Sequence, residues 1–333
     1  MATARDVAEL AGTSTAVVSY VFNNGPRPVA AATRQRVLKA AAELQYRPNA
    51  LAKALSAGRT HSIGLVVPHI RNSYFAALAE QLERVTRERD HLLLIGDAGG
   101  DKDREDRLIE SFVERQVDGL VLVSLHDMED LSGIDTGGVA AVALHPVPDG
   151  ARMSSLAVVS VDAARDATAH LLAHGHTRIG LLTEPAGTAG SEEHLAGALA
   201  AAAGKSDVRI DHQTCTVSRY DARDLGLDWF RRPDRPHAVY CATDEQAFGI
   251  LNAAWEVGLE IPGDLAVIGG DGTDECAVTV PPLAAIHRPV DQLAELAIET
   301  LLDHEPGPPT HRALGHTLIR RTSCGCQQPH THN

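Results

Sequence analysis

The chain has 333 residues, of which 44% are hydrophobic and 22% are charged, so it is long enough for two or three domains with their own cores. No apolar run approaches the ~18 residues that a membrane-spanning helix requires, and the N-terminus lacks a basic and then apolar signal segment. Together with five cysteines that form no C-x-x-C pair, these features predict a cytoplasmic protein without a membrane partner.

The net charge of −14 is distributed unevenly along the chain. Residues 1–60 contain eight Lys and Arg against three Asp and Glu, whereas the remainder contains 22 against 41. The first segment therefore carries +5 and the remainder carries −19. A basic segment on an acidic body is typical of a DNA-binding domain joined to a domain that does not touch DNA.

The basic segment begins with a pattern of two short helices. Apolar residues at helical spacing predict a first helix over residues 5–11, and Gly12 follows as a stop signal. Thr13 and Ser14 are candidate N-caps for a second helix, which ends in turn residues that start at Asn23. Two short helices joined by a glycine-containing turn form a helix-turn-helix, whose second helix presents its first residues to the DNA major groove. A plain helical hairpin is the alternative.

A third helix is predicted over residues 31–44, with one apolar face and basic residues on or near the other. Pro48 ends the helical pattern, and residues 49–55 form one more short helical segment with Asn49 as its cap. A helix this short is marginal alone in water, so we expect it to become ordered only against DNA and a partner segment.

Three stretches together resemble the lactose-repressor (LacI/GalR) family of transcriptional regulators. They read RDVAELAGTSTAVVSYVFNN, TRQRVLKAAAELQYRPNALAKAL and HSIGLVVP, and the resemblance is dense over residues 4–68. It continues at lower density to about residue 323, so it covers nearly the whole chain. It implies a helix-turn-helix DNA-binding domain over residues 1–47, followed by a hinge helix and linker over residues 48–60.

From residue 62 onward, short apolar runs alternate with amphipathic helical patterns, which predicts an α/β body with parallel sheets covered by helices on both faces. About ten strands are too many for one sheet, so we expect two sheets. The predicted strands are 63–67, 91–97, 119–124, 139–144, 156–161, 178–183, 238–243, 265–270 and 283–286. The predicted helices are 74–89, 102–116, 163–174, 191–203, 221–231, 244–257 and 290–303.

The resemblance implies that the body has the type I periplasmic-binding-protein fold, with an effector in the cleft between two subdomains. We expect the effector-binding and dimerisation domain to span residues 61–327. Its subdomains are expected at about 61–160 with 289–317, and at about 161–288 with 318–327.

By the resemblance, Thr15, Ala16 and Tyr20 at the start of the second helix read the bases. Tyr20 stands where the family usually has Arg, and a tyrosine cannot make the bidentate bond of Arg to guanine. Its ring can pack on a thymine methyl, so we expect an unusual operator preference; an ordinary surface tyrosine is the alternative. Ala30 replaces the Ser that usually caps the third helix. The candidate phosphate contacts are Thr3, Ser14, Ser19, Asn23, Arg27 and Thr33.

The hinge of the family becomes helical on operator DNA and inserts a leucine into the minor groove. The matching residue here is Leu55, with Ala52 and Lys53 beside it. An apolar side chain that wedges between base steps in this way kinks the duplex. The alternative is that Leu55 packs on the body.

Residues after the predicted strands are candidates for the effector site, because ligands bind at the carboxyl ends of parallel strands. His194 replaces an Arg of the family pattern and Gly270 replaces an aromatic residue, so we expect an atypical or smaller ligand, or none. Carboxylates such as Asp244 and Asp271 suit the hydroxyls of a sugar or nucleoside. A helix cap at Asp244 and a plain turn at residues 72–74 are the alternatives. The candidates are Asn72, Ser73, Tyr74, Phe75, Asp97, Ser124, His194, Asp244 and Asp271.

The C-terminal tail combines Cys324, Cys326, His330 and His332, which are ligand types for zinc or copper. Because the tail is terminal and rich in Pro, Gln and Thr, we expect disorder over residues 328–333 and assign no metal and no cofactor to the chain. A metal-responsive regulator is the alternative that this tail leaves open.

The sequence thus predicts a homodimeric transcriptional repressor that binds a palindromic operator and is controlled by a sugar-like or nucleoside-like effector. A sugar-binding receptor without a DNA role is a second class, and the basic segment argues against it. No nucleophile elbow, phosphate loop or zinc-protease motif occurs, so we expect no enzyme. Deletion of residues 1–60 separates these classes, since only a regulator would lose DNA binding and keep its ligand.

Overall fold

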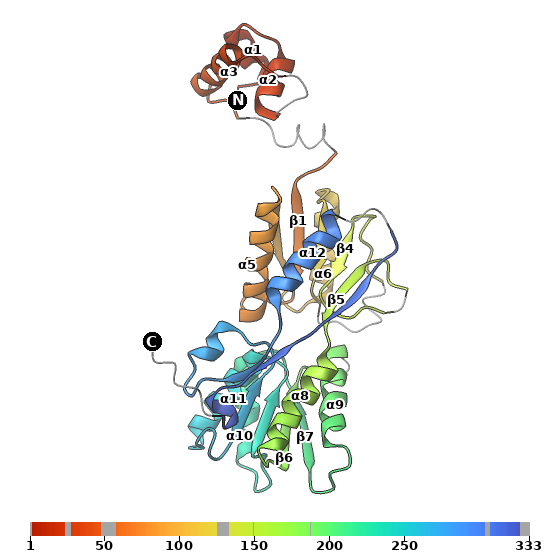
Figure 1. Ribbon diagram of the computed structural model, residues 1–333, viewed down its shortest axis with the longest axis vertical. Coiled ribbons are helices and arrows are strands. Elements are labelled where there is room, and N and C mark those ends of the chain that lie inside the picture. Colours follow the sequence, from red (N-terminus) through yellow and green to blue (C-terminus); the bar gives the residue numbers. More distant parts are fainter. Residues whose placement is uncertain are drawn as a thin grey trace. The chain divides into compact units, whose positions relative to one another are not determined.

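The structure is a computed structural model of the whole chain. It describes residues 2–23, 28–47, 58–124, 133–148, 150–186, 188–303 and 307–326. The chain divides into two compact units, Met1–Thr60 and His61–Asn333 (Figure 1). The hinge candidates Ala52, Lys53 and Leu55 lie outside the described residues.

The described residues of the first unit form three helices, as the sequence predicts for this part: α1 (Ala4–Ala11), α2 (Thr15–Asn23) and α3 (Ala31–Glu43). Ala30 precedes α3 and makes no capping bond with its side chain. Small apolar side chains from all three helices form one core, which lets the short helices approach closely. The buried members of this core are Val7, Ala8, Ala11, Val18, Val21, Val37, Ala40 and Ala41.

Capping side chains and a glycine fix the ends of the first two helices. Thr3 and Asp6 form a capping box, in which the Asp6 amide donates to Thr3 Oγ1 over 3.3 Å and the Thr3 amide donates to Asp6 Oδ2 over 2.8 Å. Gly12 ends α1 at φ +62°, a left-handed conformation that suits glycine. The Val17 amide donates to Ser14 Oγ over 3.3 Å, so Ser14 caps α2 as the sequence predicts.

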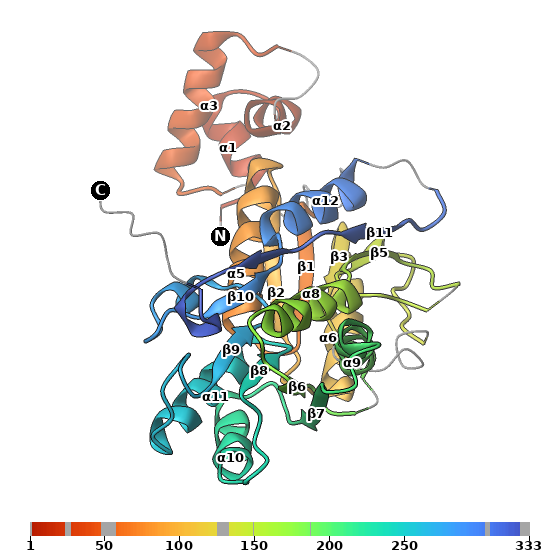
Figure 2. The ribbon, with the colours of Figure 1, turned by 60° about the horizontal axis from the view of Figure 1, so that its bottom comes forward.

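The second unit contains two six-stranded sheets with helices packed against them (Figure 1, Figure 2). The first sheet has the strand order β11-β5-β4-β3-β1-β2, and all its pairs are parallel. Its strands are β1 (Ser62–Val67), β2 (Leu92–Asp97), β3 (Gly119–Leu122), β4 (Ala141–Ala143), β5 (Ser154–Val158) and β11 (His311–Leu314). Its helices are α5 (Ser73–Glu88), α6 (Lys102–Glu114) and α12 (Val290–Leu302).

Strand β1 shows why this sheet needs helices on both faces. All six of its residues are buried. Ile63 and Leu65 pack with apolar side chains of α5 and α12, whereas Val66 points the other way and packs with α6. A continuous apolar run is what a central parallel strand requires, because neither of its faces meets water.

The second sheet has the strand order β12-β10-β9-β8-β6-β7. Its strands are β6 (Arg178–Thr183), β7 (Arg209–Thr214), β8 (Ala238–Cys241), β9 (Ala266–Gly269), β10 (Ala284–His287) and β12 (Thr317–Ile319). Helices α8 (Ser160–Ala173) and α9 (Ala189–Ala202) contribute to the core on one face, and α10 (Arg219–Phe230) and α11 (Asp244–Glu256) to the core on the other. Two 3-10 turns, η1 (Asp274–Ala277) and η2 (Thr322–Cys324), complete this half.

The chain passes between the two sheets three times, after β5, after β10 and after β11. The two sheets therefore belong to two lobes joined by three connecting segments. The first crossing lies at Val159, where β5 gives way to α8. In sheets of this kind the carboxyl ends of the strands carry the ligand site, and the crossings bring those ends of the two lobes toward one another.

The alternation of strands and helices is confirmed, with departures at the sheet edges. The apolar run 156–161 was expected to be one strand, but β5 ends at Val158 and α8 begins at Ser160. Edge strands β7, β11 and β12 have polar or short sequences that give no apolar run. The pair β10–β12 is antiparallel, the exception to the parallel pairing that the sequence predicts. Among the described helices, none is both long and apolar enough to cross a membrane.

Candidate functional site

The predicted DNA reader lies on the exposed start of α2. Thr15 and Ala16 are exposed and Tyr20 is half-buried. Among the candidate phosphate contacts, Thr3, Ser14 and Ser19 are exposed and Thr33 is half-buried. The Thr3 and Ser14 hydroxyls also serve as helix caps, so any phosphate contact of theirs is shared with a capping bond. Arg27 and the side chain of Asn23 lie outside the described residues.

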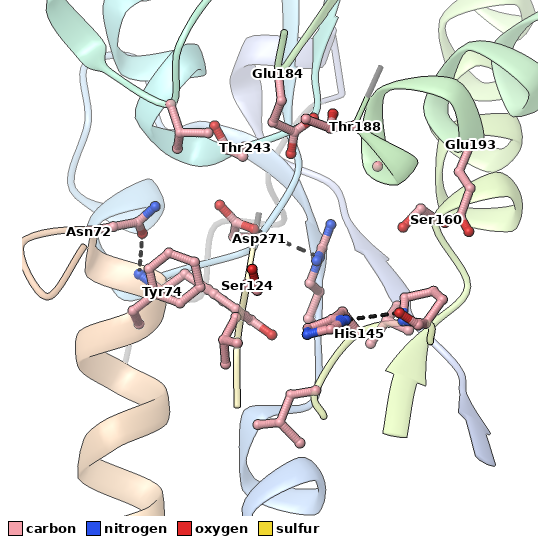
Figure 3. A pocket seen from close by; sticks show the side chains of 18 of the residues that line it. Asn72, Tyr74, Ser124, His145, Ser160, Glu184, Thr188, Glu193, Thr243 and Asp271 are labelled. Carbon is pink, nitrogen blue, oxygen red and sulfur yellow. Dashed lines mark hydrogen bonds and ion pairs between the residues drawn. The ribbon is translucent and has the colours of Figure 1, made fainter. Parts of the chain in front are cut away.

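A pocket between the two lobes collects most of the predicted effector residues (Figure 3). The predicted residues that line it are Asn72, Tyr74, Phe75, Ser124, His194 and Asp271. The start of α5 enters the pocket because Asn72 caps that helix, with Asn72 Oδ1 accepting from the Tyr74 amide over 2.8 Å. Figure 3 shows Tyr74 and Ser124 on one side of the space and Glu184 and Thr243 on the opposite side.

The remaining three predicted residues serve the protein's own backbone and side chains. Asp97 Oδ1 accepts from the Gly99 amide over 3.1 Å, which fixes the turn after β2. Ser73 hydrogen-bonds the side chain of Glu275. Asp244 is buried, and its Oδ2 accepts from the Thr273 amide over 2.7 Å and from Thr273 Oγ1 over 2.9 Å. None of the three is among the described residues that line the pocket.

A buried ion pair forms part of the pocket lining. Arg288 Nε lies 3.7 Å from Asp271 Oδ1, and the Arg288 guanidinium carbon lies 5.6 Å from the centre of the Tyr74 ring. Arg288 Nε also donates to the Gly270 carbonyl over 3.1 Å. A side chain at position 270 would place its Cβ 1.9 Å from the Ala242 carbonyl oxygen, so the loop requires glycine there. Burial and the neighbouring Asp244 raise the pKa of the Asp271 carboxyl.

His194 stands in the pocket as a neutral imidazole. It is 1% exposed, and its Nδ1 lies 3.1 Å from the hydroxyl of Tyr240. Burial and the nearby charge of Arg288 lower the pKa of His194 to about 3. His194 stands where the family pattern has an arginine, and Arg288, which follows β10, brings a guanidinium to the pocket.

Two buried acceptors of the pocket have no partner among the described residues. They are Glu184 Oε2 and His145 Nε2. His145 Nδ1 lies 2.8 Å from the carbonyl of Pro146, which can only accept, so Nδ1 carries the proton and Nε2 is left as an acceptor. Burial raises the pKa of Glu184 and lowers the pKa of His145. Unpaired buried acceptors are costly, so both atoms are suited to a ligand that donates hydrogen bonds.

A third carboxyl group, Glu193 on α9, lies opposite Ser160 at the start of α8 (Figure 3). Burial raises the pKa of Glu193, and a hydrogen bond with the Ser160 side chain opposes this shift. With Glu184 and Asp271, the pocket therefore has three carboxyl groups against the guanidinium of Arg288. Such a lining disfavours an anionic ligand and suits hydroxyl groups, while Tyr74 supplies an apolar wall.

Several pocket residues that the sequence analysis did not identify also follow strands, as the predicted residues do. His145, Glu184, Thr243 and Arg288 follow β4, β6, β8 and β10 by one or two residues. They lie at the carboxyl ends of their strands, where parallel sheets place ligands. Applied to every predicted strand, this rule would have included His145, Glu184 and Arg288, whereas Thr243 lies inside the predicted strand 238–243 because β8 ends earlier, at Cys241. Thr188 and Glu193 come from the start of α9 and had no such signal.

Comparison with known proteins gives two family matches. Residues 3–49 match the family described as bacterial regulatory proteins, lacI family, and residues 168–324 match a periplasmic binding protein-like domain. The ribose operon repressor of Escherichia coli strain K12 is 33% identical over 318 residues, which cover 93% of this chain and 94% of that protein. The HTH-type transcriptional repressor PurR of Vibrio vulnificus is 30% identical over 311 residues, covering 91% of this chain and 92% of the repressor. These relatives are repressors, in agreement with the prediction that the chain is not an enzyme.

Solved structures support the same fold. The lac repressor dimer bound to operator and the anti-inducer ONPF matches with a TM-score of 0.86 and 24% identity, covering 97% of this chain and 99% of that chain. A LacI family regulator from Enterococcus faecium with bound ribose matches with a TM-score of 0.69 and 20% identity, covering 79% of this chain and 98% of that chain. The N-terminal helix-turn-helix and the periplasmic-binding-protein-like body are thus confirmed as the fold.

Proposed function

Since the chain belongs to the lacI family of bacterial regulatory proteins, we propose that this DNA-binding repressor binds a palindromic operator as a homodimer and responds to a neutral, hydroxyl-rich small molecule in the pocket. The two units have separate roles. Residues 1–47 read DNA, residues 48–60 form the hinge, and the body from residue 61 binds the effector and the second subunit. Such a protein works on DNA in the cytoplasm.

The exposed start of α2 supports the assignment of base reading to Thr15 and Ala16, and Tyr20, which is half-buried, lies further along the same helix. The N-terminal residues of a recognition helix are those that reach base edges in the major groove. A methyl group at Ala16 and a phenol at Tyr20 offer apolar contact with thymine and a single hydrogen bond, in place of bidentate bonds to guanine. The operator half-site of this protein is therefore expected to contain thymine opposite Tyr20.

Dimerisation and the hinge role of Leu55 rest on likeness to relatives. The lac repressor is a dimer on its operator in the structure with which this chain shares its fold. Two heads bound to two half-sites place their hinges at the centre of the site, where an apolar side chain such as Leu55 would insert in the minor groove. This arrangement predicts a two-fold symmetric operator with a flexible central base step.

The single observation that carries the effector class is the pair of unpartnered acceptors, Glu184 Oε2 and His145 Nε2. Hydroxyl groups of a ligand are the simplest donors to these two atoms, one hydroxyl to each. The carboxyl groups of Glu193 and Asp271 add further acceptors, and Tyr74 offers a face for a sugar ring or a base. The ribose operon repressor is among the relatives, and a solved LacI family neighbour holds bound ribose. We therefore place pentoses and nucleosides first among the candidate effectors.

The ligand can act on DNA binding only through different affinities for two arrangements of the lobes. The pocket is lined from both lobes, so a bound ligand favours whichever arrangement brings its contacts together. The geometry is compatible with either effect: a bound ligand can lower the affinity of the repressor for its operator or raise it. Measurement of the operator affinity with and without the ligand shows which of the two effects occurs.

Calorimetric titration of the purified full-length chain tests the effector class. Neutral pentoses, hexoses and nucleosides are compared with sugar phosphates and sugar acids. We expect binding in the neutral series, and a loss of at least about tenfold in affinity for Glu184→Gln, because a hydrogen-bonded charged group contributes about 1.5–3 kcal/mol. Glu192→Gln, on the exposed side of α9, is the matched control and should bind normally. Binding of only the anionic series would contradict the proposal.

A further inference from the structure

Two histidines and two cysteines gather at the C-terminal end of α8. His170 Nε2 lies 3.3 Å from Cys324 Sγ and 3.5 Å from Cys326 Sγ. His174 Nε2 lies 3.5 Å from Cys326 Sγ. Among the described residues, His170, Cys324 and Cys326 form a group whose ligand atoms all lie within 4.8 Å of one another. This cluster lies at the opposite end of α8 from Ser160, so it is separate from the effector pocket.

These separations fit hydrogen bonds, and they also fit the ligands of one bound metal ion. Zinc binds cysteine sulfur at ~2.3 Å and histidine nitrogen at ~2.0–2.1 Å with tetrahedral angles, which places neighbouring N and S ligands about 3.5 Å apart. The three N···S distances, 3.3, 3.5 and 3.5 Å, match this value. Cys326 faces two imidazole nitrogens at once, and its single thiol proton can be donated to only one of them.

Helix geometry places the two imidazoles together. His170 and His174 are four residues apart at the end of α8, so their side chains lie on one face of the helix. Their ring centres are 4.7 Å apart. Two histidines at this spacing on one helical face are a recurrent arrangement for holding zinc.

The turn that carries the cysteines is fixed by the Ser323 hydroxyl and by one bond that Cys324 Sγ donates to the Arg321 carbonyl over 3.2 Å. Ser323 Oγ donates to the Val267 carbonyl over 2.6 Å and accepts from the Ala284 amide over 2.8 Å. These bonds hold η2 against the second sheet. Gly325 follows at φ +88°, a left-handed conformation that reverses the chain between the two cysteines. Both sulfur atoms are thereby brought to the end of α8.

We propose that His170, His174, Cys324 and Cys326 form a binding site for a thiophilic d10 cation, with Zn2+ as the expected occupant. His170, Cys324 and Cys326 provide the core of the site, and His174 completes four-coordination through a small side-chain movement toward Cys326. Two thiolates with two imidazoles suit Zn2+, and thiolates also suit Cu+. Carboxylates are absent from the described residues of the cluster, so hard cations such as Mg2+ are disfavoured.

Binding involves proton release and no redox step. Each cysteine thiol loses its proton to water as the S–metal bond forms, so one Zn2+ displaces up to two protons. A bound cation would hold η2 and Cys326 against the end of α8. A site that forms only in the folded chain stabilises that chain by an amount that rises with the logarithm of the metal concentration above Kd.

Titration of the reduced full-length protein with Co2+, a spectroscopic substitute for Zn2+, tests the site. We expect one equivalent per chain, with the visible bands of tetrahedral cobalt and a near-ultraviolet thiolate-to-cobalt band. Zn2+ should bleach these bands and raise the melting temperature, and a chelator should reverse both changes. A separate titration with Cu+ under anaerobic conditions shows which cation binds more tightly.

Four variants locate the ligands. Cys326→Ser and His170→Ala should weaken metal binding by more than about 100-fold, since loss of outer partners of a metal ligand alone costs about 10–100-fold. His174→Ala should weaken binding less, because His174 contacts one sulfur in the cluster. Cys326 is only partly buried, so Cys326→Ser retains the fold even where substitution of the fully buried Cys324 does not. Cys215→Ser, a half-buried thiol elsewhere, is the matched control and should bind normally.

Three results would overturn the proposal. The first is the absence of thiolate-to-cobalt absorption in the reduced protein. The second is unchanged stoichiometric binding by Cys326→Ser and His170→Ala. The third is loss of binding on joint substitution of His330 and His332 by Ala, which would move the site to the tail, outside the described residues.

Discussion

Arg288 Nε lies 3.7 Å from Asp271 Oδ1, and this pair joins the crossing segment after β10 to the loop after β9. Both residues line the pocket. Arg288 is the only Lys or Arg among the described residues of that lining, and it is already paired with a carboxylate. The described lining residues thus leave no free cation for an anionic ligand, which supports the proposed preference for neutral hydroxyl groups.

Arg288→Met should lower the free energy of unfolding by about 3 kcal/mol, because removal of one partner leaves a buried carboxylate without its counter-charge. The Asp271 side chain is 4% exposed and that of Arg288 is 19% exposed. Urea unfolding measures the change. The double variant Arg288→Met/Asp271→Asn should recover part of the loss, and Arg165→Met, which breaks an exposed pair with Asp162, should cost under about 1 kcal/mol. Equal losses in the single and double variants would count against the pair.

Glu184→Gln should stabilise the protein in a pH-dependent way. Burial raises the pKa of Glu184 above its usual 4.5, so the folded chain binds this proton more tightly than the unfolded chain. The native carboxyl therefore lowers stability progressively as pH rises from about 4.5 through its folded-state pKa. The stability difference between Glu184→Gln and the native chain should grow over that window and then level off.

Urea unfolding at a series of pH values checks this, with Glu192→Gln as the exposed control that should give a flat difference. A difference that shrinks as pH rises would mean that the folded state favours the ionised carboxylate at Glu184. The expected gain in stability together with weaker effector binding would identify Glu184 as a residue kept for function.

Tyr240→Phe should lower the free energy of unfolding by about 1–2 kcal/mol, because it leaves His194 Nδ1 without the hydroxyl that lies 3.1 Å away. Both residues are at most 1% exposed, so water does not replace the lost bond. Tyr220→Phe, at a tyrosine that is 73% exposed, is the control and should have little effect. A loss no larger than that of Tyr220→Phe would show that the imidazole does not depend on this partner.

Tyr20→Ala should change operator preference more than general DNA affinity, since Tyr20 lies on the helix that presents residues to the bases. We expect about a tenfold loss of specific over non-specific binding, near the lower range for one base contact. Selection of bound sequences from random duplex DNA, at one stated salt concentration, measures it. An equal loss on all sequences would assign Tyr20 to phosphate binding or to folding of the head.

The head and the central strands could be predicted because their signals are local. Gly12 and Ser14 mark a helix end and a helix start that depend only on adjacent residues. The run around Leu65 is apolar because both faces of the strand are covered. Strand β7 reads RIDHQT and carries no apolar run, since an edge strand that is only partly buried does not need one.

The site could be predicted in part. The sequence shows where a polar residue follows a strand, but it does not show which groups its side chain contacts in the folded chain. Asp244 and Asp271 occupy similar positions, yet the Asp244 carboxylate bonds Thr273 while Asp271 lines the pocket. The sequence analysis did not identify Arg288, because it looked for an arginine only at the family position that His194 occupies. The contact between His170 and Cys324 spans 154 residues and needs the folded chain to form.

The central claim is that a neutral hydroxyl-rich ligand in this pocket controls DNA binding by the head. Its most direct test is the affinity of the full-length protein for its selected operator, by fluorescence anisotropy at constant salt, with and without a saturating neutral ligand from the calorimetric screen. We predict a change of about 5–150-fold in Kd in native protein, the usual range of allosteric coupling, and little change in Glu184→Gln at the same ligand concentration. An operator affinity that is the same with and without the bound ligand would contradict the account.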